Sequence, residues 1–216
     1  MEGRKALLEH EVKGLLREAD LPVPRGTFIS KDALLLPEIA LTYPLIAKVS
    51  STEIVSKSDV RGIRPGLNNV DELKGAVAEL MRIEKAAGVL VEEMAPPGIE
   101  VIIGGIRDNQ FGPVVMFGLG GVFVEIFKDV AFALAPMQKH DALWLIGQVK
   151  GARLLEGYRG NPPVDTDALV GIIVAVSELM AAHSVEEIDL NPVALYPHGA
   201  MILDAKMLLA EKSTKL

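Results

Sequence analysis

The sequence has no cysteine among its 216 residues, few aromatic side chains and fewer basic than acidic residues. Without cysteine, the chain can form no disulfide, no thiol nucleophile and no cysteine-based metal centre. The 22 basic residues against 29 acidic residues give a net charge of −7, which argues against a nucleic-acid partner. The four histidines are scattered without the spacing that a zinc site requires. These absences exclude disulfide scaffolds and thiol enzymes and disfavour zinc proteins.

Long apolar runs are also missing. The most apolar stretch, residues 169–182, contains Ser177 and Glu178 and is too short to cross a bilayer, so it predicts a buried helix. The N-terminus leads into a charged amphipathic helix and has no signal-peptide core. We therefore expect a cytoplasmic protein without a membrane partner.

The apolar spacing predicts alternating helices and strands up to about residue 90, followed by antiparallel strands and further helices. Helices are expected over residues 5–19, 30–40, 69–87, 139–155 and 166–183. Strands are expected over residues 26–29, 44–49, 88–91, 100–106, 111–117, 122–127 and 130–135. This order predicts an α+β fold of two lobes, residues 1–90 and residues 91–216.

One C-terminal segment suggests a ligand site. Residues 187–193 alternate between polar and apolar side chains, which places Asp189 and Asn191 on one face of a strand. Two apolar runs around a turn at residues 197–199 predict a β-hairpin that brings Asn191 opposite residues 204–206. An amide oxygen and a carboxylate near one point, completed by substrate phosphates, would suit Mg²⁺. The alternative is a hairpin with polar ends and no ligand.

A lysine within an apolar strand marks a second candidate site. Burying Lys48 costs desolvation unless it meets an anion such as a phosphate, although an edge strand with Lys48 facing water fits equally well. The polar loop 50–62 beside it could fold over phosphates or be a solvated connection. Glu92 and Glu93 could bracket a ligand together with Glu100, but exposed carboxylates are common.

Three glycines in residues 118–121 allow the backbone to approach another group closely or to adopt positive φ. Successive backbone amides in such a loop can bind an anion. No helix pattern follows, so neither a P-loop nor a dinucleotide fingerprint fits. A structural hairpin turn is the alternative.

Taken in order, these segments resemble the beta subunit of ADP-forming acetyl-CoA synthetase (acetate–CoA ligase), an ATP-grasp module of the acyl-CoA synthetase superfamily. The likeness extends over nearly the whole chain. Its marks are Pro44–Ser50, Lys57–Val60, Val91–Met94, Gly98–Glu100, Phe111–Val114, Gly118–Glu125, Leu155–Gly160 and Glu187–Val193. The resemblance implies an α+β ATP-grasp fold of two lobes with the nucleotide bound between them.

The resemblance also implies nucleotide contacts. Lys48 would contact the phosphates, a hinge of residues 92–94 would lie against adenine, and Glu100 would lie near the ribose or the phosphates. The residues expected to bind ATP or ADP are Lys48, Glu92, Glu93, Met94, Glu100, Gly120 and Gly121.

The family converts acyl-CoA, ADP and phosphate reversibly into the free acid, CoA and ATP. The acyl-CoA half of this reaction takes place on an alpha subunit, and a histidine there carries the phosphoryl group, so a hetero-oligomer is expected. Asn191 and Asp204 look like the Mg²⁺ pair of the related succinyl-CoA synthetase beta chain, in which a carboxylate at the position of Asp189 faces the phosphohistidine. With Lys57 and Ser56, Asp189 forms the expected catalytic set.

Three positions depart from the family pattern. Many relatives have a histidine at the position of Ser56, a glycine at that of Arg61 and an arginine at that of Ala133. That histidine takes the phosphoryl group before ADP does, whereas a serine phosphate is an ordinary ester with too little transfer potential to form ATP readily. The chain could therefore use the alpha-subunit phosphohistidine alone. The alternative is a nucleotide-binding regulatory homologue that has lost turnover.

Overall fold

The computed structural model describes residues 4–33, 37–121, 124, 126–158, 160, 162–182 and 184–210. The chain forms two compact units. Residues 8–14 and 24–96 make up the small unit, and the described residues of 1–7, 15–23 and 97–216 make up the large unit. No helix in the described ranges is long and apolar enough to span a membrane.

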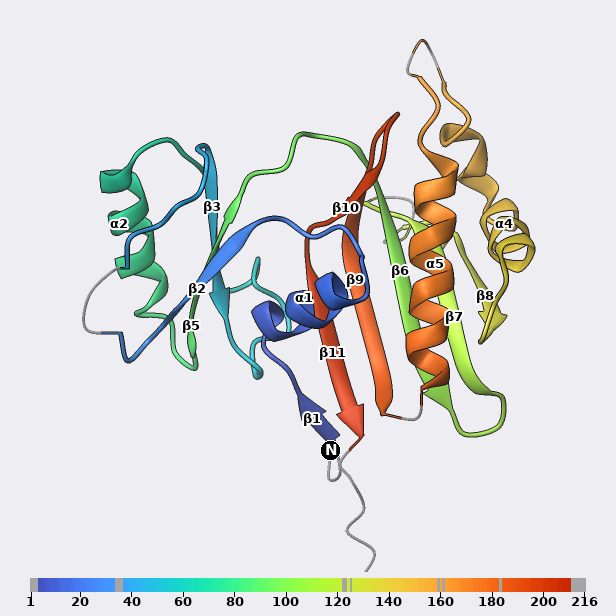
Figure 1. Ribbon diagram of the computed structural model, residues 1–216, viewed down its shortest axis with the longest axis horizontal. Helices are drawn as coiled ribbons and strands as arrows, with labels where there is room; N and C mark the ends of the chain where they lie inside the picture. Colours follow the sequence, from blue (N-terminus) through green and yellow to red (C-terminus); the bar gives the residue numbers. More distant parts are fainter. Residues whose placement is uncertain are drawn as a thin grey trace, which may run out of the picture. The chain divides into compact units, whose positions relative to one another are not determined.

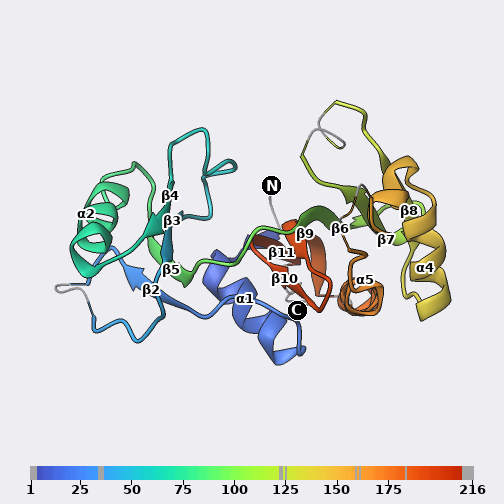
Figure 2. The ribbon, with the colours of Figure 1, turned by 90° about the horizontal axis from the view of Figure 1, so that it is seen from above.

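The small unit is built on a four-stranded antiparallel sheet of order β2-β5-β3-β4, of which Figure 1 labels β2, β3 and β5. Its strands are β2 (Gly26–Ser30), β3 (Leu45–Ser50), β4 (Ile63–Leu67) and β5 (Gly88–Glu93). Helix α2 (Val70–Leu80) packs on one face of this sheet, as Figure 2 shows from above. The helix predicted over residues 69–87 is confirmed at its start, where the Asn69 side chain accepts hydrogen bonds from the amides of Asp71 and Glu72, but it ends at Leu80.

Strand β5 pairs with β2 and β3 along its whole length, from Gly88 to Glu93. The predicted lobe boundary at residue 90 lies inside this paired strand. A division there would separate residues that share a hydrogen-bonded ladder, and the two compact units divide after Pro96 instead.

The helix predicted over residues 30–40 is wrong in its described residues. Residues 31–32 form a turn, in which the amide of Ala33 donates to the carbonyl of Ser30 and the amide of Asp32 donates to the Ser30 hydroxyl. The serine side chain thus offers the backbone a local alternative to the helix. Residues 37–40 have no regular structure, and residues 34–36 lie outside the described part of the chain.

The large unit contains a seven-stranded antiparallel sheet of order β1-β11-β9-β6-β7-β8, with β10 paired to β9. Its strands are β1 (Arg4–Ala6), β6 (Ile99–Asp108), β7 (Gly112–Leu119), β8 (Val130–Leu134), β9 (Val185–Leu195), β10 (Ala200–Ile202) and β11 (Ala205–Ala210). Helices α4 (Lys139–Gly147) and α5 (Thr166–Ala181) pack on one face (Figure 1). Fully buried Ile103, Phe117 and Leu190 of the central strands form the core with Ile173 and Val176 of α5.

Helix α1 (Glu9–Glu18) begins in the small unit and ends in the large unit. The sequence predicts this helix from residue 5, but residues 4–6 form β1, which pairs with β11. The amide of Leu7 continues the pairing by donating to the carbonyl of Met207 at 3.1 Å. The helix starts where the carboxylate of Glu11 accepts the amide of Leu8 at 2.7 Å.

The helix predicted over residues 139–155 is divided. Helix α4 ends at Gly147, and a 3₁₀ helix, η1 (Lys150–Leu154), follows. The carboxylate of Asp129 accepts the amides of Lys150 and Gly151, both at 2.8 Å. A residue distant in sequence therefore fixes the start of a second helix.

The strand predicted over residues 122–127 is not found in its described residues. Ile126 and Phe127 lie in a turn and Val124 is helical, while residues 122, 123 and 125 lie outside the described ranges. The other three strands of the predicted meander are confirmed as β6, β7 and β8.

The carboxyl end of α5 is capped by a side chain from β6. The guanidinium of Arg107 donates to the carbonyl oxygens of Met180, Ala182 and Val185 at 2.7, 3.3 and 3.3 Å. Carbonyls at a helix C-terminus lack partners within the helix, so this cation satisfies them and interacts favourably with the helix dipole.

Replacing Arg107 with methionine should destabilise the large unit. Because the carbonyls it binds would lose a charged donor, we expect the free energy of unfolding to fall by about 1–3 kcal/mol. Urea unfolding followed by circular dichroism measures the change, and amide hydrogen exchange localises it to the end of α5. The exposed Arg153→Met serves as the control, and equal effects of the two variants would contradict the capping role.

Candidate functional site

The two faces of the small unit's sheet differ in chemistry. Leu45, Ala47 and Val49 of β3 belong to the apolar core beneath α2. Because side chains alternate along a strand, Lys48 and Ser50 point to the opposite face. Both are buried, and the Ser50 hydroxyl has no hydrogen-bond partner among the described residues.

Five buried side chains meet on this face and are called here the lysine–glutamate cluster: Glu9, Lys13, Lys48, Lys57 and Glu92. The Glu92 carboxylate lies 2.7 Å from the Nζ of Lys48 and 2.7 Å from the Nζ of Lys13. The Glu9 carboxylate lies 2.8 Å from Lys13, 3.0 Å from Lys57 and 3.3 Å from Lys48. No side chain of the cluster is more than 9% exposed, so it is an interior ionic network.

The cluster holds three ammonium groups and two carboxylates, so as a set it carries a positive charge. Burial by itself would raise the pKa of Glu9, but the ammonium groups of Lys48, Lys13 and Lys57 outweigh burial and hold this pKa far below its usual range. Burial lowers the pKa of Lys13, and the repulsion from Lys48 adds to this, while Glu9 and Glu92 act in the opposite direction. Each charge is therefore tolerated only because its neighbours remain in place.

Two glycines make room for this arrangement. A Cβ atom on Gly26 would lie 2.8 Å from Cγ of Glu92 and 2.9 Å from a backbone oxygen of β5. A Cβ atom on Gly88 would lie 2.6 Å from the ring of Phe28, which stacks on His10 of α1 with ring centroids 3.9 Å apart. Side chains at these two positions would therefore collide with Glu92 of the cluster and with Phe28, on whose ring His10 of α1 stacks.

The polar loop after β3 is docked onto that strand. The amide of Gly62 donates to the carbonyl of Lys57 at 2.6 Å, and the amide of Val49 donates to the carbonyl of Gly62 at 2.7 Å. This fold of the loop places the Lys57 ammonium in the cluster. Ser56 lies beside it, and its hydroxyl accepts the amide of Asp59 at 3.3 Å.

The predicted hinge residues lie at the end of β5. The Glu92 side chain is 1% exposed and holds Lys13 and Lys48, so its carboxylate serves the cluster. Glu93 accepts the amide of Thr42 at 2.9 Å, and the amide of Met94 donates to a carbonyl at the start of β3. Their contact with adenine stays a prediction.

The predicted C-terminal hairpin is confirmed in the large unit. In β9, Ile188 and Leu190 are buried, whereas Asp189 is half-buried and Asn191 is exposed. Strands β9 and β10 pair around the turn at residues 197–199. The amide of Asn191 donates to the carbonyl of Asp204 at 3.2 Å, so the backbones of the two predicted magnesium ligands are adjacent.

The glycines after β7 have the two roles that the sequence predicts. The amide of Gly120 donates to the carbonyl of Glu100 at 2.8 Å, and a Cβ atom on Gly120 would lie 2.9 Å from that oxygen. Gly121 has a positive φ of 60°. The structure therefore brings Gly120 and the exposed Glu100 together at one end of the sheet.

Among the described residues, no group of three or more acidic or histidine side chains could hold a metal ion. A site made from the amide oxygen of Asn191 and the carboxylate of Asp204 does not need such a group. Hard oxygen atoms from two side chains, with phosphates and water completing the shell, fit the preference of Mg²⁺. The backbone contact between these residues is consistent with that donor set.

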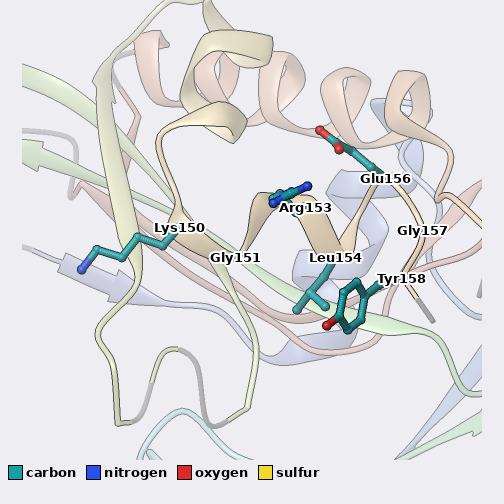
Figure 3. A pocket seen from close by; sticks show the side chains of 7 residues that line it. All are labelled: Lys150, Gly151, Arg153, Leu154, Glu156, Gly157 and Tyr158. Atoms are coloured by element: carbon teal, nitrogen blue, oxygen red, sulfur yellow. The ribbon is translucent and has the colours of Figure 1, made fainter.

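A separate cavity of about 420 Å³ lies beside η1 in the large unit. It is lined by Lys150, Gly151, Arg153, Leu154, Glu156, Gly157 and Tyr158. In Figure 3, Leu154 and Tyr158 lie close together, and Lys150 extends away from them. None of the predicted site residues lines this cavity.

Sequence reasoning assigned no role to Glu9 and Lys13. The sequence feature that could have indicated them is an acidic and a basic residue four positions apart on a predicted helix. Such a pair is usually exposed. Their burial depends on Glu92, which is 79 residues from Lys13 in sequence.

A family model of the ATP-grasp domain matches residues 1–209 of this chain. The chain is 40% identical to acetate–CoA ligase (ADP-forming) I subunit beta of Pyrococcus furiosus, over 95% of this chain and 92% of that subunit. It is also 40% identical to acetate–CoA ligase (ADP-forming) II of Archaeoglobus fulgidus, over 95% of this chain but 31% of that protein. The chain thus spans nearly all of a beta subunit and about a third of the longer ligase.

Among solved structures, the chain is similar to dinucleotide-forming acetyl-coenzyme A synthetase 1 of Candidatus Korarchaeum cryptofilum in complex with coenzyme A and Mg-AMPPCP. The TM-score is 0.79 and the identity is 39%, over 95% of this chain and 93% of that chain. In that structure a phosphohistidine segment points towards the nucleotide-binding site.

Stability should depend on pH through Glu9. Its folded-state pKa lies below the unfolded value of about 4.3, so its stabilisation is fully present above about pH 5 and is lost as the pH falls. The difference in melting temperature between wild type and Glu9→Gln should therefore narrow from about pH 6 to about pH 3. Scanning calorimetry measures the melting temperatures of both proteins, with the exposed Glu18→Gln on the same helix as the control. A difference in melting temperature that stays constant or widens as the pH falls would contradict this role of Glu9.

Proposed function

The chain belongs to the ATP-grasp domain family, among relatives that include the beta subunits of ADP-forming acetate–CoA ligases, and on this premise we propose that it is the nucleotide-binding beta subunit of an ADP-forming acyl-CoA synthetase. The predicted α+β ATP-grasp fold with two antiparallel sheets is confirmed. The observation that carries the proposal is the match to a beta subunit over 92% of that subunit's length.

The proposed reaction transfers a phosphoryl group between a phosphohistidine and ADP, forming ATP, or runs in reverse. Such transfers need mainly positioning and neutralisation of charge. Lys48 would contact the phosphates, which is supported by the net positive charge of the lysine–glutamate cluster. The orphaned hydroxyl of Ser50, on the same face of β3, adds a polar group that a ligand could satisfy.

The large unit would supply the remaining contacts. Asn191 and Asp204 would hold Mg²⁺, and the bound ion would neutralise phosphate charge. Asp189 would face the phosphohistidine, and Glu100 with the amides near Gly120 would contact the nucleotide. The adjacent backbones of Asn191 and Asp204, and of Glu100 and Gly120, support these assignments.

We propose that the phosphohistidine belongs to an alpha subunit that also carries the acyl-CoA chemistry, so that this chain is active as a ligase only in a hetero-oligomer. The names of the Pyrococcus furiosus relatives as beta subunits support such a partner. Acid recognition would belong to the alpha subunit, and the complex would be cytoplasmic.

One observation favours a second function. Ser56 replaces the usual histidine, and its hydroxyl accepts a backbone amide in a local turn. A chain that lacks this phosphoryl carrier could bind nucleotide in a regulatory role without turnover.

The proposed metal pair can be tested by nucleotide binding. We expect Asn191→Ala and Asp204→Ala to weaken the Mg²⁺-dependent binding of ADP by roughly 10- to 100-fold, the range found when groups that support a bound metal are removed. Calorimetry with and without Mg²⁺ measures this, and the exposed Asn109→Ala is the control. Unchanged Mg²⁺-dependent affinity in both variants would refute the pair.

Transfer of ³²P from a phosphorylated alpha chain to ADP tests turnover. Wild type should form labelled ATP, since the alpha-subunit phosphohistidine can supply the phosphoryl group directly. Failure of wild type together with success of Ser56→His would instead establish the regulatory function. Thr52→His, which adds a histidine at an exposed position of the same loop, should behave as wild type does.

A further inference from the structure

We propose that Glu9 is a positioning residue for the phosphate-binding lysines, because its carboxylate holds the ammonium groups of Lys48 and Lys57 together. The inference rests on the proposed function, which takes Lys48 as a contact of the nucleotide phosphates, and it extends that role to Lys57 of the same cluster. Glu9 itself carries a negative charge and acts through the lysines rather than on the ligand.

The contacts of Glu9 set it apart from the other carboxylate of the cluster. Glu92 binds Lys13 and Lys48, whereas Glu9 binds Lys13, Lys48 and also Lys57 of the loop. Its Oε1 atom contacts Lys13 and Lys48, and its Oε2 atom contacts Lys57 at 3.0 Å. Within the cluster, Glu9 is therefore the link between the strand lysine and the loop lysine.

Neighbouring residues of helix α1 hold the Glu9 carboxylate in place. Lys13 lies one turn after Glu9 on α1, and its ammonium bridges Glu9 at 2.8 Å and Glu92 at 2.7 Å. The stack of His10 on Phe28 holds the same turn of the helix against β2. Glu9 is thus a preorganised anion, built into the unit by its neighbours in α1 and β5.

Lysines need such a partner to serve as a fixed site. A lysine side chain is long and flexible, and ammonium groups that gather at one place repel one another. Most residues of the loop that carries Lys57 are exposed, so this side chain could otherwise turn towards solvent. A carboxylate placed among the ammonium groups offsets their repulsion and holds them in position.

Electrostatics alone and positioning predict opposite outcomes when the charge of Glu9 is removed. Loss of a negative charge near a phosphate site would strengthen the binding of an anion if only long-range charge mattered. Loss of a positioning group would weaken binding, because Lys57 would no longer be held next to Lys48. The direction of the change therefore separates the two.

The experiment measures the affinities of each variant for MgADP and for adenosine by calorimetry. The affinity for the weaker ligand is obtained from competition with the tighter one. Glu9→Gln should weaken MgADP about tenfold and leave adenosine unchanged, since the lysines contact only phosphates. Glu9→Asp retains the charge but draws the carboxylate back, and it should also weaken MgADP. Glu18→Gln removes the same charge from an exposed position of α1 and should bind as wild type does. Equal losses for adenosine and MgADP would mean a general structural defect and overturn the proposal.

A double-mutant cycle with Lys57→Met tests whether Glu9 acts through the loop lysine. The effect of Glu9→Gln on MgADP should largely disappear when Lys57 is already methionine, and an undiminished effect would overturn the proposal. If Glu9→Gln does not fold, Glu9→Asp with the same cycle decides the question. If wild type binds MgADP and both Glu9 variants bind it equally well or better, only this inference is overturned. Wild type that binds no MgADP would overturn the proposed function as well.

Discussion

The interior ion network of the small unit is the constraint on which the rest of that unit depends. Three lysines and two glutamates are removed from water, so each charge needs its partners to remain folded. The network joins the first turns of α1, the strands β3 and β5, and the loop after β3. Glycines at positions 26 and 88 leave room for the Glu92 side chain and for the Phe28 ring, on which His10 of α1 stacks. A group of charges thereby sets the position of four segments that apolar packing alone would leave less well defined.

The large unit builds its candidate site by a different means. Its predicted ligands lie on strands or directly beside them and are placed by backbone hydrogen bonds, such as the contact of Asn191 with Asp204 and that of Gly120 with Glu100. A sheet covered on one face by α4 and α5 gives these positions a rigid support. Phosphoryl transfer needs groups that neutralise charge and groups that hold a metal ion, and each unit carries proposed residues of one kind.

The structure of the loop changes what the departure from the family's histidine at Ser56 implies for its function. The loop is docked on β3 through Gly62, and its Lys57 is part of the ion network. A nucleotide-binding role for the loop can therefore persist without a phosphoryl carrier at position 56. In the proposed function, the binding of phosphate and its covalent transfer would be separate properties of this segment, and only the second would depend on a histidine.

The sequence by itself determined the features that rest on local pattern. Alternation in residues 187–193 and the turn at 197–199 predicted the hairpin, Asn69 predicted the start of α2, and the ordered motifs predicted the ATP-grasp fold. Tertiary structure alone decided that Asp129 starts a second helix at Lys150 and that Glu9 and Lys13 are buried. The physical reason is the range of the interactions. Turns and strand faces are set by neighbours in the chain, whereas burial of the Glu9–Lys13 pair depends on Glu92, 79 residues beyond Lys13.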